Sequence, residues 1–236
     1  AHACWDYFLP FSGLLEDTRL RQTYSRYLRI RQQSPGVVSY LGLRNYLRYR
    51  NPARLDFPWG WKDPRNTFTL PVWLEVFGGA KVIHVKRHGV DVAKSLVVRN
   101  TRSRENGLNQ FARWYSNPIV YRLRPKRGGF VDSFRCRFYE GAFEVWREYM
   151  EQAEALLKHT SVPLLELGYE KILQHPEAEL EKLLGFCGMA HKTHAIPEIA
   201  AGLDPQRAFA FKDNPEMCRF ALDHADTLTR FGYPPK

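Results

Sequence analysis

The sequence predicts an α/β fold in which a parallel sheet is flanked by helices. The segment KVIHV at 81–85 is apolar and β-branched at nearly every position, which is typical of a strand buried on both faces of a parallel sheet. Gly89 and a helical pattern over 90–99 follow it directly. A second strand-like segment, VPLLELGY at 162–169, lies between two helical patterns. Strands that alternate with helices in this way indicate a parallel sheet covered by helices.

The first part of the chain is expected to be helical. Apolar spacing predicts helices at about 14–32 and 38–49, and Pro52 and Pro58 then interrupt the pattern. The short segment FPWGW at 57–61 is expected to be extended.

The next segment leads into the first buried strand. Residues 70–77 are predicted to form a helix with Thr69 as its N-cap, and Gly78 and Gly79 are expected to end it. The stretch 57–99 therefore alternates strand, helix, strand and helix.

Two further helices follow from periodicity and end signals. The strongest helical pattern covers 139–159, and its apolar residues at i, i+3 and i+4 spacing are Phe143, Trp146, Met150, Ala153 and Leu157. The segment 176–188 has Pro176 in its first turn and Gly188 at its end, as a helix often does.

The basic charge is concentrated in one part of the chain. The protein has 35 Lys and Arg against 25 Asp and Glu, a net charge of +10 over 236 residues. Residues 1–150 hold 26 of the bases and 12 of the acids, which favours an anionic ligand there. The arginine-rich segment 19–33 is interpreted either as a surface helix or as a helix that binds an acceptor or nucleic acid. No known nucleic-acid motif accompanies it, so nucleic acid is not the expected partner.

Length and composition predict a single domain of residues 1–236. No run reaches the roughly 18 apolar residues of a membrane span, and no secretory signal opens the chain. The four cysteines are scattered without a CxxC pair, as in reduced thiols of a cytoplasmic protein. No cluster has the spacing of metal ligands, so no metal is expected.

The expected site lies at the carboxyl ends of the strands, where ligands bind in open α/β sheets. Arg87 follows the strand 81–85 almost directly and precedes a glycine and a helix start, so its guanidinium can meet an anion through two hydrogen bonds. Ser95 lies two helical turns later and can share that anion. Arg87 can also pair with Asp91, one turn along the helix.

These residues carry a family resemblance. The segment 59–99 resembles the sulfotransferase superfamily that uses 3′-phosphoadenosine 5′-phosphosulfate, in which an Arg at a strand end and a Ser eight residues later hold the nucleotide's 3′-phosphate. Arg87 and Ser95 match that pair. The segment 167–189 resembles a later segment of the same superfamily, although Lys171 and Cys187 depart from its usual residues.

The resemblance implies a P-loop-like nucleotide-transferase fold and a role for several residues. Tyr169 matches a residue near the adenine, and Lys62 in the segment KDP matches a lysine that reaches the sulfuryl group and bridging oxygen. Arg65, a second cation near the same strand end as Lys62, is also expected to bind the nucleotide. Arg207 and Lys212 fall in the late region where the superfamily places a lid over the nucleotide.

The superfamily's glycine-rich loop for the 5′-phosphosulfate is the main departure. The segment FSGLLED at 11–17 matches it poorly and lacks its basic residue. The first strand and loop are expected to be missing through truncation, with a degenerate member or a strand supplied by another chain as alternatives. The usual catalytic base follows that loop, and Asp6 is the candidate, with His2 and Glu16 as weaker ones.

The expected function is transfer of a sulfuryl group from 3′-phosphoadenosine 5′-phosphosulfate to a hydroxyl or amine of a carbohydrate, lipid or small molecule. The alternative is a non-catalytic protein that binds anions or nucleic acid on a degenerate sulfotransferase-like fold. Each site residue also has a structural interpretation. Lys62 can be a solvated lysine beside a turn, Ser95 a small packing residue, and Tyr169 the edge of the core. The oligomeric state and the acceptor stay open.

Overall fold

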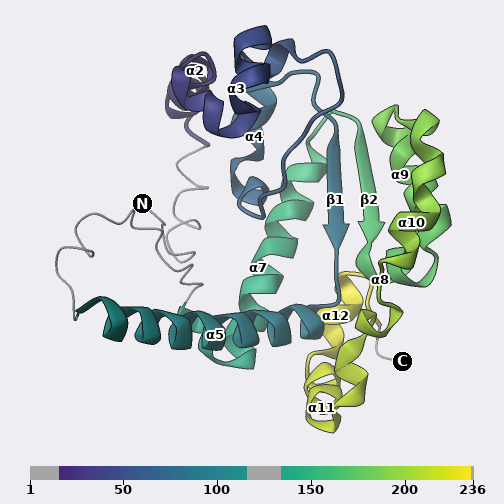
Figure 1. The fold of residues 1–236 in the computed structure, drawn as a ribbon. Coiled ribbons are helices and arrows are strands. Elements are labelled where there is room, and N and C mark those ends of the chain that lie inside the picture. The colour runs from purple at the N-terminus through teal and green to yellow at the C-terminus, as the bar shows by residue number, and fades with distance from the viewer. Residues whose placement is uncertain (1–15, 116–133, 235–236) are drawn as a thin grey trace. The chain divides into compact units, whose positions relative to one another are not determined.

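A computed structural model describes residues 16–115 and 134–234, which are mostly helical with a small parallel sheet (Figure 1). The chain divides into two compact units. The sheet unit contains residues 16–86 and 152–208. The helical unit contains the remaining described residues, which lie between 87 and 151 and between 209 and 234.

The sheet unit contains β1 (Val82–Lys86) and β2 (Leu164–Gly168). The strands pair in parallel, with a register from Val82 opposite Leu164 to Lys86 opposite Gly168. Figure 1 shows the two arrows side by side and pointing the same way. The predicted parallel pairing is therefore confirmed, and both strands present their carboxyl ends at one edge.

The strands differ in how well they are covered. Leu165 and Leu167 of β2 are buried, and α9 packs against this strand. Their register partners on β1 are Ile83 and Val85, which are 42% and 52% exposed. The prediction of a first strand buried on both faces is wrong, because the cover over β2 does not extend over these two side chains.

The helices of the sheet unit match most of the predicted segments. They are α2 (Thr18–Arg31), α3 (Val38–Tyr49), α4 (Asn66–Val76), α8 (Tyr169–Gln174), α9 (Pro176–Cys187) and α10 (Ile196–Ala201), with short 3-10 turns η2 (Pro35–Val37), η3 (Pro52–Arg54), η5 (Ala190–Ala195) and η6 (Pro205–Arg207). Pro176 stands in the first turn of α9, and Gly188 ends it with a positive φ of 71°. Gly42, with φ 74°, bends α3 at its middle.

The region before β1 differs from its prediction. Residues 57–61 form no strand, and the rings of Trp59 and Trp61 stack on each other instead. The following helix, α4, begins four residues earlier than expected, with Arg65 as its N-cap. Thr69 is therefore an interior residue, and its hydroxyl donates to the Arg65 carbonyl.

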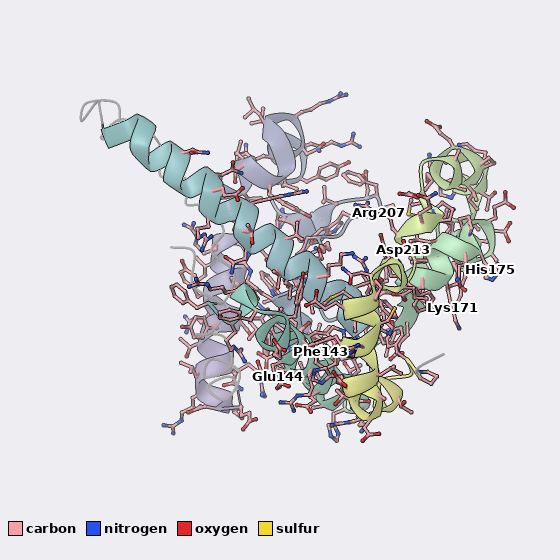
Figure 2. The ribbon with its side chains drawn as sticks, turned by 90° about the horizontal axis from the view of Figure 1, so that it is seen from below. Phe143, Glu144, Lys171, His175, Arg207 and Asp213 are labelled. Carbon is pink, nitrogen blue, oxygen red and sulfur yellow. The ribbon has the colours of Figure 1, made fainter. Side chains whose placement is uncertain are left out.

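The helical unit is built around α5 (Gly89–Tyr115) and the first part of α7 (Tyr139–Lys158). The end of α7 is close to the predicted one, whereas α5 continues well beyond the predicted 90–99. The other elements are η4 (Phe134–Arg137), η7 (Ala210–Asp213), α11 (Pro215–Asp223) and α12 (Ala225–Arg230). One hydrophobic core joins them, and Phe143 of α7 is among its largest buried side chains (Figure 2).

Candidate functional site

The start of α5 is held close to α7. A Cβ on Gly89 would lie 2.7 Å from an atom of Trp146 and 2.8 Å from one of Phe143, so glycine alone fits here. The indole Nε1 of Trp146 donates to the carbonyl of Arg87 at 3.1 Å. These contacts fix the turn that joins the end of β1 to the first residue of α5.

A buried carboxylate organises the same turn. Asp91 is 2% exposed, and its Oδ1 accepts the backbone N–H of Phe211 at 2.9 Å. Its Oδ2 lies 3.8 Å from Nη2 of Arg87, whose side chain is 28% exposed. The predicted pairing of Arg87 with Asp91 is thus present. At 3.8 Å the two groups lie within ion-pair range, although this distance exceeds a normal hydrogen-bond length.

His88 is buried in this turn and stays neutral. Its ring stacks on Phe211 at 4.3 Å and meets Tyr233 edge-on at 5.2 Å. Nδ1 accepts the backbone N–H of Val90 at 3.3 Å, which satisfies one of the unpaired donors at the helix start. Burial lowers the pKa of His88 to about 4, and the charges of Lys212 and Arg87 add to this effect.

Lys212 belongs to the same neighbourhood. It lies in η7, is exposed, and has its ammonium 5.2 Å from the ring centre of Phe209. The neighbouring Asp213 ends η7 (Figure 2). The sequence analysis assigned Lys212 only to a late region that resembles a lid. It did not predict that Lys212 lies near His88, because this depends on the hydrogen bond between Asp91 and Phe211. These two residues are 120 positions apart, so no local sequence pattern indicates the bond.

The arrangement is suited to an anion. Arg87 and Lys212 supply positive charge, and the N-terminus of a long helix adds its dipole and backbone donors. Ser95 lies on α5 one turn beyond Asp91, on the same side of the helix, and its side chain is exposed. The predicted role of Ser95 beside Arg87 stays a prediction.

Tyr169 occupies the end of the neighbouring strand. It is the first residue of α8 and is half-buried. Tyr169 directly follows Gly168, the last residue of β2. In the sheet unit, α8 packs against η6, which carries Arg207, and Figure 2 labels Arg207 and Lys171 on these two elements.

Lys62 lies in the loop before α4. Its side chain is exposed, whereas Arg65 is bound by Asp63. The Asp63 carboxylate accepts the backbone N–H of Arg65 at 2.9 Å and its Nε at 2.8 Å. These bonds lower the pKa of Asp63. Arg65 thus shapes the loop, and Lys62 carries the more accessible charge.

Some residues named in the sequence analysis do not belong to the turn before α5 or the loop before α4. Asp6 and His2 lie outside the described residues, and Glu16 is exposed just before α2. Cys187 and Cys218 are thiols outside any disulfide. In the described ranges, no three His, Cys, Asp or Glu side chains form a group that could hold a metal ion. None of the helices described is both long and apolar enough to cross a membrane.

A comparison with known protein families identifies the class of protein. The family model described as the sulfotransferase family matches residues 11–193, most of the chain. The protein belongs to this family, whose members transfer sulfuryl groups. No curated protein and no solved structure matches the chain.

Proposed function

We propose that the protein transfers a sulfuryl group from 3′-phosphoadenosine 5′-phosphosulfate to a hydroxyl, or an amine, of a carbohydrate, lipid or small molecule. The observation that carries this proposal is the turn between β1 and α5. There Arg87 is oriented by buried Asp91, beside exposed Lys212 and a helix N-terminus. A phosphate has the charge and the acceptor oxygens that this arrangement fits.

The nucleotide is held by residues at the strand ends. Arg87 and Ser95 bind the 3′-phosphate through a guanidinium and a hydroxyl. Tyr169 lies against the adenine. This assignment follows the family resemblance, and it is supported by the exposure of Ser95 and the position of Tyr169 one step beyond β2.

Transfer breaks the bond between sulfur and the bridging phosphate oxygen and forms a bond between sulfur and the acceptor oxygen. Adenosine 3′,5′-bisphosphate leaves, and the acceptor proton goes to a carboxylate, for which Asp6 is our candidate. Lys62 stabilises the bridging oxygen as it gains charge, since positioned cations give most of the help in such a transfer. The scattered cysteines, without a CxxC pair, support a reducing compartment, and we place the reaction in the cytoplasm.

The assignment is tested by titration calorimetry with adenosine 3′,5′-bisphosphate. We expect Arg87→Ala to weaken binding by about 1.5–3 kcal/mol, the scale of a lost hydrogen bond to a charged group. The matched control is adenosine 5′-phosphate, which lacks the 3′-phosphate and should bind wild type and variant equally. Equal affinity of both proteins for the bisphosphate would remove Arg87 from the site.

A further inference from the structure

The helix α2 has two faces of different chemistry. Its inner face packs against α4, where Glu75 binds two of its side chains. Arg21 donates its Nε to Glu75 at 2.5 Å, and Ser25 donates its hydroxyl to the same carboxylate at 2.7 Å. Ser25 is 4% exposed. These bonds fix how α2 is rotated about its own axis, and so they fix which residues point outward.

The outer face of α2 carries apolar side chains flanked by arginines. Successive residues are about 100° apart around a helix, so Tyr27 and Ile30 lie opposite the inner face. Tyr27 is 54% exposed and Ile30 is 60% exposed. Arg19 and Arg26 border this stripe on one side and Arg31 borders it on the other, and all three are exposed. We call this set, Arg19, Arg26, Tyr27, Ile30 and Arg31, the α2 outer face.

The segment that carries the α2 outer face is strongly basic. Residues 17–56 contain nine arginines and two acidic residues, Asp17 and Asp56. Asp17 is used as the N-cap of α2, where its carboxylate accepts two backbone N–H groups. Asp56 binds Arg48 and the hydroxyl of Tyr49. The partner that complements this surface is therefore anionic.

The exposed aliphatic side chains favour a lipid membrane over nucleic acid as the anionic partner. In the same unit, Leu43 and Leu47 of α3 are 63% and 57% exposed and stand one helical turn apart. Nucleic acid gains little from contact with aliphatic side chains, because it binds proteins through phosphates, base edges and stacking on aromatic rings. An apolar stripe between arginines is the pattern of helices that lie in the plane of a membrane interface.

We propose that the α2 outer face docks on the surface of an anionic lipid bilayer. Tyr27 and Ile30 enter the boundary between headgroups and acyl chains, and the flanking arginines bind lipid phosphates and carboxylates. The interaction is peripheral, and it does not depend on the proposed sulfuryl transfer.

Co-sedimentation with lipid vesicles tests this proposal on the full chain. Wild type should bind vesicles rich in phosphatidylserine and leave phosphatidylcholine vesicles unbound, and about 1 M salt should release it. We expect Ile30→Asn to weaken binding about fivefold, the value of the exposed part of one aliphatic side chain. The control Leu222→Asn changes a side chain that is 64% exposed on α11 and should have no effect.

Charge reversal gives a second comparison. We expect Arg26→Glu to weaken vesicle binding about tenfold or more, since each arginine near an anionic surface contributes about 1 kcal/mol. Arg104→Glu makes the same change in net charge at an exposed position on α5 and should lose less than twofold. Circular dichroism confirms that each variant is folded.

Three results would overturn the proposal. Equal losses in Arg26→Glu and Arg104→Glu would show attraction by net charge alone. If the protein bound RNA in a salt-sensitive way and did not bind vesicles, and if Ile30→Asn left the RNA binding unchanged, the partner would be nucleic acid. A dimer in sedimentation velocity that Ile30→Asn dissociates would show that the α2 outer face meets a second copy of the chain.

Discussion

The turn before α5 and the loop before α4 each carry a predicted site cation, but they hold it differently. Arg87 is 28% exposed, and its backbone and side chain are oriented by Trp146 and by buried Asp91. Lys62 is exposed, and the ordered contacts of its loop belong to Asp63 and Arg65. The first cation is placed before any ligand arrives, whereas the second retains freedom of movement.

From this difference we expect Arg87 to act mainly in nucleotide binding and Lys62 mainly in the transfer step. A pre-oriented guanidinium loses little entropy when it binds, so it contributes to nucleotide affinity. A lysine on a flexible stem can follow an oxygen that gains charge only as the bond to sulfur breaks. A contact made only in the transition state raises kcat and leaves ground-state affinity unchanged. The following experiments test this comparison, beginning with the largest expected effect.

Lys62→Ala should lower kcat on the order of 10²-fold or more, the scale of a deleted oxyanion donor, and change nucleotide affinity little. Radiolabelled sulfate transfer measures the rate, and calorimetry with adenosine 3′,5′-bisphosphate measures affinity. Lys182→Ala, at an exposed position on α9, is the matched control. A variant that keeps full kcat, or loses affinity alone, would return Lys62 to the role of a solvated lysine beside a turn.

The buried histidine gives the turn before α5 a dependence on pH. The pKa of His88 is about 4 in the fold, below its ordinary value of 6.5, so the unfolded chain binds the proton first as the pH falls. The contribution of neutral His88 to the free energy of unfolding is therefore fully present above pH 6.5. It is lost as the pH falls from 6.5 to 4, and the loss is about 3 kcal/mol at most.

Urea unfolding of wild type and His88→Asn at pH 7 and pH 5 measures this contribution. Asparagine can still accept the N–H of Val90, as a good N-cap does, but it does not titrate. We expect the fall in unfolding free energy between the two pH values to be smaller in the variant. An unchanged fall would show that other groups cause the acid sensitivity.

The sequence predicted the elements whose signals are local. The run of β-branched residues before Gly89 located β1 and the start of α5, and Pro176 with Gly188 located α9. The two strands were also predicted to be parallel, since helices separate them in the chain. Of the site, the strand-end position of Arg87 and its pairing with Asp91 followed from spacing alone.

The differences arise where specific side-chain contacts, and not the hydrophobic pattern, decide the structure. Trp59 and Trp61 have strand-like neighbours, but their rings stack on each other and pack with Phe77, so no strand forms. Asp63 binds Arg65 and starts α4 before Thr69. The position of Lys212 near His88 depends on the bond between Asp91 and Phe211, which no local pattern predicts.

The tight turn before α5 should also limit which residues it accepts. Gly89→Ala brings a Cβ within 2.8 Å of ring atoms of Phe143 and Trp146. We expect this overpacking to cost about 1–3 kcal/mol of unfolding free energy in urea titrations. Gly78→Ala is the control, because a Cβ there meets nothing within 4 Å, and its effect should stay within about 0.5 kcal/mol. Equal effects of the two substitutions would show that α5 can move away from α7.

Ser95 gives the smallest and most specific test of the comparison. Its side chain is exposed on α5, one turn beyond Asp91, so removal of the hydroxyl creates no cavity and should leave stability unchanged. If the hydroxyl binds the 3′-phosphate beside Arg87, Ser95→Ala should weaken adenosine 3′,5′-bisphosphate by about 0.5–1.5 kcal/mol, the net value of one hydrogen bond. Binding of adenosine 5′-phosphate should stay the same.

In a double-mutant cycle with Arg87→Ala, two groups on one phosphate should give non-additive losses. Additive losses would place Ser95 and Arg87 on separate parts of the nucleotide, and no loss would make Ser95 a solvated residue of α5.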